Sequence, residues 1–210
     1  MAAKAARRGE AHEPWSHNIA YFPFIVNEAR KRPRRSAIDV GTANGMLAAQ
    51  LADVIPSVVG LDAHSEQVES AAAAHPDVPG LRFEVGDVLT THFADEPFDF
   101  VACSATLHHM DTVAGLERLR ELTAPGGTLV IVGLAFDSSA WDRVVHVATR
   151  VPIRLARARH GWYQHGGPVA GPKESWSEIR RLVAIALPGA RFRKRLYWRY
   201  SVVWDRPDAT

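Results

Sequence analysis

The chain has 210 residues with an ordinary globular composition, 47% hydrophobic and 23% charged, and a formal net charge of +2. This length predicts one domain with a core large enough to fold alone, and the sequence lacks the run of about 18 apolar residues that a membrane span needs. The small net charge provides no argument for a nucleic-acid partner, and the single cysteine, Cys103, excludes an intrachain disulfide and fits a reducing compartment.

Residues 1–35 are expected to form an N-terminal helical cap. The start, MAAKAARRGEAHEPW, has basic residues but no apolar core behind them, so we expect no signal peptide and a cytoplasmic location. The stretch WSHNIAYFPF (15–24) carries Trp15, His17, Asn18 and Tyr21 on a candidate helix. This segment could either pack in the core or fold over a bound ligand, and the sequence leaves both roles open.

Apolar runs and helical patterns alternate over the next hundred residues. Strands are expected at 36–41, 57–62, 81–87, 98–104 and 128–135, and helices at 44–54, 64–74 and 112–123. Asp111 is placed to cap the third of these helices, and Pro-Gly-Gly is expected to turn the chain into the fifth strand. Strands joined by helices of this length predict βαβ units with a parallel sheet and right-handed crossovers.

The last third of the chain departs from this rhythm. Residues 138–160 have a helical, arginine-rich pattern that Pro152 should kink, 161–173 is a Gly/Pro-rich loop, and 174–187 is an expected helix. The runs 191–198 and 200–207 are two expected strands whose short link requires them to be antiparallel. The sheet is therefore predicted to end in a hairpin.

The turn after the first strand, in AIDVGTANGMLAAQL (37–51), is a candidate ligand site. It lacks the Lys-Ser or Lys-Thr of a P-loop and the three-glycine spacing of the dinucleotide fingerprint. Asp39 precedes the first glycine, where it would repel a pyrophosphate and favour a cationic ammonium or sulfonium. An NAD(P)-dependent oxidoreductase is disfavoured on both grounds.

Two further acids end the second and third strands. In open α/β sheets, ligands bind beyond the carboxyl ends of the strands where the strand order reverses. Asp62 follows the Gly turn by about 20 residues, the position of a ribose-binding acid in nucleotide-binding βαβ units. Asp87 can accept a hydrogen bond from the exocyclic amine of adenine. Acids at three consecutive strand ends favour a nucleoside that carries positive charge.

These residues resemble a class I S-adenosylmethionine-dependent methyltransferase of the small bacterial type, similar to the methyltransferase-11 domain, over about 36–135. The resemblance implies an α/β, Rossmann-like, doubly wound sheet of seven strands, mostly parallel with an antiparallel C-terminal strand, and S-adenosyl-L-methionine as the cofactor. The family's methionine-binding turn matches Asp39, Gly41, Ala43 and Gly45, and its ribose acid matches Asp62, with Ala63 beside it. Its adenine-side acid matches Asp87, with Val88 beside it, and its fourth-strand motif matches Cys103 and Ser104.

Ala43 departs from the family pattern, which has glycine there. Because only a turn position with positive φ strictly requires glycine, Ala43 is expected to be tolerated. Cys103 itself is expected to be a buried small hydrophobe rather than a nucleophile.

His108 is the candidate general base, since it follows the fourth strand near the expected methyl acceptor and imidazole titrates near neutral pH. An orienting role for His108 and His109 in the loop remains open. The segment 138–173, with Trp162, Tyr163 and His165 on its loop, is the expected substrate lid. No His/Cys cluster has metal-ligand spacing, so no metal is expected.

The predicted activity is methyl transfer to an O or N atom of a small-molecule acceptor. A non-catalytic S-adenosylmethionine-binding protein and an RNA-directed methyltransferase remain as alternatives. Basic clusters at 30–35 and 191–195 could contact phosphate, but the fourth-strand motif differs from that of base-amine methyltransferases. Nucleic acid is therefore disfavoured as a partner. Membrane association of residues 143–159 as an amphipathic helix is also disfavoured. The oligomeric state is left open.

Overall fold

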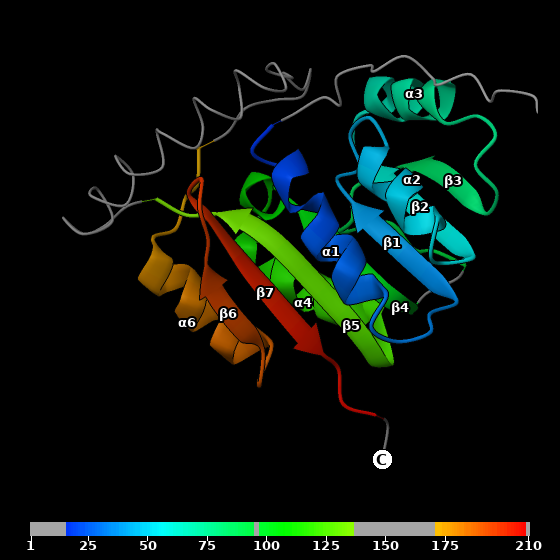
Figure 1. The fold of residues 1–210 in the computed structure, drawn as a ribbon. Helices are drawn as coiled ribbons and strands as arrows, with labels where there is room; N and C mark the ends of the chain where they lie inside the picture. Colours follow the sequence, from blue (N-terminus) through cyan, green and yellow to red (C-terminus); the bar gives the residue numbers. More distant parts are fainter. Residues whose placement is uncertain (1–15, 95–96, 137–170, 209–210) are drawn as a thin grey trace, which may run out of the picture.

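The computed structural model describes residues 16–94, 97–136 and 171–208. Their centre is a seven-stranded sheet in the order β3-β2-β1-β4-β5-β7-β6 (Figure 1). The strands are β1 (Ser36–Val40), β2 (Ser57–Asp62), β3 (Leu81–Val85), β4 (Phe98–Ser104), β5 (Thr123–Leu134), β6 (Arg191–Lys194) and β7 (Arg199–Asp205). The pairs from β3 to β5 are parallel, and β7 is antiparallel to both β5 and β6. The predicted fold class and the C-terminal hairpin are confirmed.

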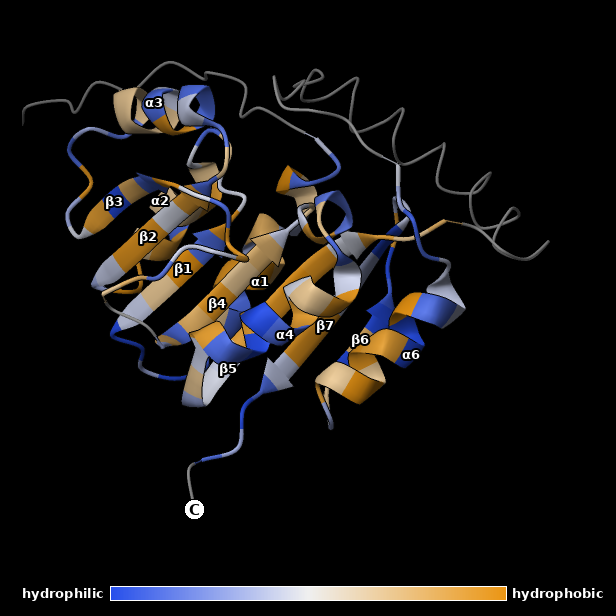
Figure 2. Ribbon diagram, turned by 180° about the vertical axis from the view of Figure 1, so that it is seen from behind, coloured by the Kyte–Doolittle hydropathy of each residue, from blue (hydrophilic) through white to orange (hydrophobic). Residues whose placement is uncertain are grey.

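Helices cover both faces of this sheet. On one face lie α1 (Phe22–Ala29), preceded by the short η1 (Ile19–Tyr21), and α2 (Met46–Ala52), while α3 (Ser65–Ala74) packs near the β3 edge (Figure 1). The opposite face carries α4 (Thr112–Leu122), preceded by η2 (Leu107–His109), and α6 (Trp176–Ala186), as the view from behind shows (Figure 2). Two apolar cores therefore form, one on each side of the sheet.

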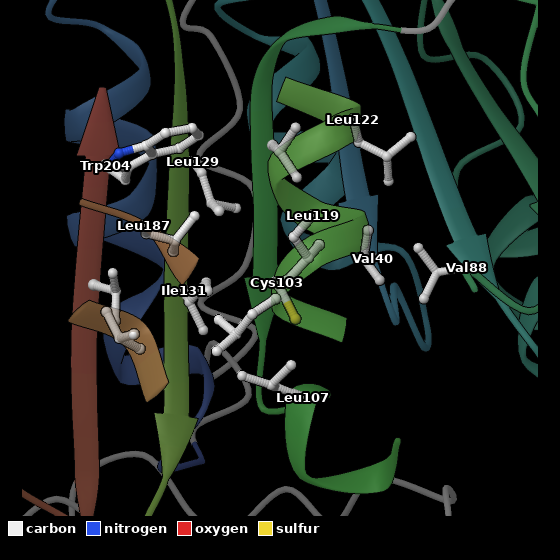
Figure 3. Packing of buried hydrophobic residues seen from close by; sticks show 14 of the residues in the cluster. Val40, Val88, Cys103, Leu107, Leu119, Leu122, Leu129, Ile131, Leu187 and Trp204 are labelled. Carbon is white, nitrogen blue, oxygen red and sulfur yellow. The ribbon is translucent and has the colours of Figure 1, made fainter. Parts of the chain in front are cut away.

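Helix starts follow the expected capping chemistry. The Asp111 carboxylate accepts a hydrogen bond from the Ala114 N–H at 2.9 Å, which confirms the predicted cap of α4. Ser175 and Glu178 form a capping box at the start of α6. The two helices pack on the core that Figure 3 shows, where Cys103 lies among apolar side chains and is 0% exposed. Burial raises the pKa of its thiol to about 12, as expected of a structural cysteine.

The entry to β5 differs from the prediction. The strand begins at Thr123 rather than after Pro-Gly-Gly, and its pairing with β4 shifts register between Phe98 and Phe100. Gly126 has φ +71°, its N–H donates to the Arg206 carbonyl at 3.0 Å, and the Gly127 carbonyl accepts from the Arg206 N–H at 2.9 Å. The Pro-Gly-Gly stretch is thus held in the sheet as a bulge by its hydrogen bonds to the Arg206 backbone.

Several predictions concern residues that lie outside the described ranges. The first 15 residues and nearly all of the expected lid at 138–173, including its arginine-rich helix and its aromatic loop, lie outside the described residues. No helix in the described ranges is long and apolar enough to cross a membrane.

Candidate functional site

A cavity of about 610 Å³ lies at the carboxyl ends of the parallel strands, where the order reverses between β1 and β4. Its lining includes every site residue that the sequence predicted except Gly45 and the buried Cys103: Asp39, Gly41, Ala43, Asp62, Ala63, Asp87, Val88, Ser104 and His108. Gly45 is not among the lining residues. A Cβ at position 45 would lie 2.6 Å from the Phe83 ring. The lack of a side chain at Gly45 therefore lets the turn pack against β3.

The turn after β1 has positive φ at Gly41 (76°), Ala43 (49°) and Gly45 (78°). Ala43 itself therefore lies in the left-handed region. The premise that the middle position lacks positive φ is wrong, and the expectation that Ala43 is tolerated stays a prediction. The left-handed conformation costs an L-residue roughly 1–2 kcal/mol. It turns the Ala43 N–H toward Asp62, whose Oδ2 accepts it at 2.9 Å.

Asp39 is a buried carboxyl group that is 2% exposed. The Thr42 hydroxyl donates to its Oδ2 at 2.9 Å. Burial raises the pKa of Asp39 to about 7, and the nearby Asp62 charge adds to the rise while hydrogen bonds from Thr42 and the Ala48 backbone oppose it.

Asp62 ends β2 and is 9% exposed. Besides the Ala43 N–H, its carboxylate accepts the His64 N–H at Oδ1 (3.1 Å), and the His64 ring Nδ1 lies 3.2 Å from the same oxygen. Both oxygens are therefore fixed by the backbone, and each keeps further lone pairs for a ligand.

Asp87 and Val88, which follow β3, line the cavity on the side of that strand. The Asp87 Oδ1 accepts the Leu89 N–H at 3.0 Å, and its carbonyl accepts the N–H groups of Thr90 and Thr91. Asp87 is thus a turn residue as well as a lining residue. Val88 is 5% exposed, and its carbonyl accepts from the Arg118 side chain at 3.1 Å.

Ser104 and two histidines line the cavity beside β4. In the described structure the Ser104 Oγ is buried and has no hydrogen-bond partner, which marks it as a group that a ligand could satisfy. His108 is 7% exposed, and its ring centroid lies 4.2 Å from that of His109. Burial lowers the pKa of His109, and the positive charges of His64 and Lys173 act in the same direction.

A family model described as a methyltransferase domain matches residues 38–131. A methyltransferase of Mycobacterium tuberculosis strain H37Rv, itself uncharacterized, is 32% identical over 197 residues, which cover 93% of this chain and 98% of that protein. The chain belongs to the S-adenosylmethionine-dependent methyltransferase family.

Solved structures have the same fold as this methyltransferase. YcgJ of Bacillus subtilis has a TM-score of 0.62 at 19% identity, covering 84% of this chain and 71% of that one. The N-methyltransferase NodS of Bradyrhizobium japonicum, solved with S-adenosyl-L-homocysteine, has a TM-score of 0.62 at 13% identity, covering 90% and 87%. At these identities the likeness supports the fold alone.

The methyltransferase cavity also has lining residues that the sequence reasoning did not assign to it. Ser16, His17, Asn18 and Phe22 line it from the N-terminal segment, where both coverage and packing had been open. Arg199 was missed. It is the first residue of β7 and pairs in register with Leu134 at the end of β5, so the antiparallel direction of β7 brings it to the cavity edge. The available signal was a cation in the short link directly before the predicted last strand at 200–207.

Proposed function

We propose that this methyltransferase binds S-adenosyl-L-methionine in the cavity and transfers the methyl group to an O or N atom of a small-molecule acceptor by in-line displacement. The observation that carries the proposal is the convergence of Asp39, Asp62 and Ser104 on one cavity at the switch point of the sheet, with the Ser104 Oγ lacking a hydrogen-bond partner among the described residues.

The donor and acceptor groups of the cavity fit this cofactor. In the proposal Asp62 accepts from the ribose hydroxyls, since its oxygens are held in place by the Ala43 and His64 N–H groups. Asp87 and the apolar Val88 lie at the adenine side. Asp39 supplies negative charge near the methionine end, and the Ser104 hydroxyl gains a partner there.

When bound between Asp39 and Asp62, S-adenosyl-L-methionine would supply an electrophilic methyl group carried on a sulfonium sulfur. His108 is the proposed base that takes the acceptor's proton, because its ring lines the cavity and is almost fully buried. Alignment of the reacting groups in a dry cavity can supply about 7–11 kcal/mol of barrier reduction. A strong catalytic dyad is therefore not required.

A small acceptor is favoured over nucleic acid for two reasons. The cavity volume lies within the range of about 300–1,000 Å³ that is typical of small-molecule sites. The basic clusters are partly engaged within the fold, since Arg34 donates to the Gly126 carbonyl and to Thr128, and Arg191 pairs with Asp205 at 3.1 Å.

Calorimetric titration tests the cofactor assignment. Wild-type protein is expected to bind S-adenosylmethionine and S-adenosylhomocysteine but not NADH. Asp62→Ala is expected to weaken both affinities roughly 10- to 150-fold, because each hydrogen bond to a charged group contributes about 1.5–3 kcal/mol. Asp77→Ala, an exposed acid outside the cavity, is the matched control. Equal affinities in all three proteins would contradict the ribose assignment, and binding without turnover of any acceptor would favour the non-catalytic alternative.

A further inference from the structure

Arg199 is a cation whose contacts with the described residues do not account for its charge. It is 7% exposed and lines the cavity beyond the end of β5. Its Nη2 donates to the Asn18 Oδ1 at 2.5 Å and its Nη1 to the Tyr197 carbonyl at 3.3 Å, both of which are neutral acceptors. In the described part of the chain its Nε is buried and has no hydrogen-bond partner.

No carboxylate of the described residues lies within ion-pair distance of this guanidinium. Burial lowers the pKa of Arg199 to about 10, and only the Tyr21 hydroxyl opposes this shift. An unpaired buried charge is strongly destabilising, and a well-packed apolar side chain in its place is often neutral or stabilising. The placement at a cavity wall therefore points to a ligand as the missing counter-ion.

We propose that Arg199 is the anion-binding residue of the acceptor site and pairs with a carboxylate of the small-molecule acceptor. A guanidinium at the cavity wall suits this partner, because two parallel N–H groups match the two oxygens of a carboxylate. The inference rests on the proposed function, whose acceptor it restricts to molecules that carry an anionic group. That group orients the acceptor and need not be the atom that is methylated.

The methionine end of the cofactor also has a carboxylate, and the sheet order separates the two sources. Three strand intervals separate β1, which leads into the proposed methionine-binding turn, from β7. Since neighbouring strands lie about 4.8 Å apart, this spacing amounts to roughly 14 Å. Arg199 is thus displaced toward the side of the cavity beyond β5, next to Asn18 of the N-terminal segment, which favours the acceptor as the source.

The test uses succinate and benzoate as probes, with succinamide and benzamide as their uncharged counterparts, added to protein saturated with S-adenosylhomocysteine. Wild-type protein is expected to show a saturable rise in melting temperature with at least one carboxylate and none with the amides. Arg199→Met should bind that carboxylate at least about tenfold more weakly, and Arg199→Lys should retain an intermediate response. Arg193→Met, an exposed residue of β6 on the same hairpin, is the matched control and should behave as wild type.

Three results would overturn the inference. One is the absence of a carboxylate response in the wild-type complex, and another is an unchanged response in a folded Arg199→Met. The third is tenfold weaker binding of S-adenosylhomocysteine by Arg199→Met with unchanged binding of 5′-methylthioadenosine, which lacks the amino acid, because this would assign the carboxylate to the cofactor. Failure of wild-type protein to bind S-adenosylhomocysteine would instead overturn the proposed function.

Discussion

Asp39→Asn is expected to remove most of the pH dependence of stability between pH 5 and 8. Burial raises the pKa of Asp39 from its ordinary value of 3.8 to about 7. The native carboxyl therefore keeps its proton over a range in which the unfolded chain has lost it. By linkage, the free energy of unfolding falls as the pH rises from about 4 to about 7 and changes little above that.

The size of the effect follows from the shift. Each pKa unit corresponds to about 1.4 kcal/mol, so the full shift of about three units amounts to roughly 4 kcal/mol. Roughly 2 kcal/mol of this falls between pH 5 and 7. Asparagine does not ionise, so the stability of Asp39→Asn relative to wild type should rise by that amount over the same interval.

Urea unfolding at pH 5, 6, 7 and 8 measures this difference directly. Asp77→Asn, an exposed carboxyl group, controls for the loss of any one acid and should follow the wild-type profile. If the wild-type and Asp39→Asn curves ran parallel across these pH values, Asp39 would not carry the raised pKa, and the account of its burial would be wrong.

The same carboxyl group is expected to make the proposed cofactor binding depend on pH. If a cation binds next to ionised Asp39, its affinity for wild-type protein should increase by up to about tenfold per pH unit from pH 5.5 to 7, since binding then releases one proton. Titration with S-adenosylmethionine should show this slope for wild type and a flat, weaker binding for Asp39→Asn. A steep slope in both proteins would assign the proton to another group.

Three further substitutions test separate parts of the site and fold. Ala43→Gly should stabilise the protein by about 0.5–1 kcal/mol, since relief of the left-handed conformation outweighs the entropy cost of glycine; a lower melting temperature would refute the strain at this turn. His108→Gln should lower kcat by about 10²–10⁴ with little change in S-adenosylhomocysteine affinity, and an unchanged kcat would remove His108 as the base. Asp111→Ala should lose about 1 kcal/mol in urea unfolding through loss of its bond to Ala114, with cofactor affinity unaltered; full stability would show that the cap contributes nothing.

The sheet and the proposed cofactor side of the candidate site were predictable because the residues that form them follow local patterns in the sequence. Each parallel strand is an apolar run that ends in a polar or small residue, and carboxyl ends of parallel strands meet at one edge. Asp39, Asp62 and Asp87 could therefore be brought together from their positions alone, and the structure places them on one cavity.

The differences arise where contacts distant in sequence override local preference. Tyr197 and Trp198 have φ +60° and +55° in the β6–β7 connection, although neither is a turn residue by composition. The His17 ring stacks on Tyr197 with centroids 5.0 Å apart, and the Tyr21 hydroxyl donates to the Leu196 carbonyl at 2.8 Å. Contacts from the N-terminal segment thus hold a turn that the hairpin sequence alone does not specify.

That dependence has a consequence for specificity. Arg199 follows directly after this strained turn, and its guanidinium is held by Asn18 from the same N-terminal segment. The two segments that form the proposed acceptor side lie at opposite ends of the chain and contain no recognisable motif, whereas the cofactor side is built from consecutive βα units. Substitutions in the N-terminal segment, such as Asn18→Ala, should therefore change acceptor binding through the position of Arg199 while S-adenosylhomocysteine affinity stays within about twofold. A parallel loss of both affinities would show that the N-terminal segment serves the cofactor rather than the acceptor.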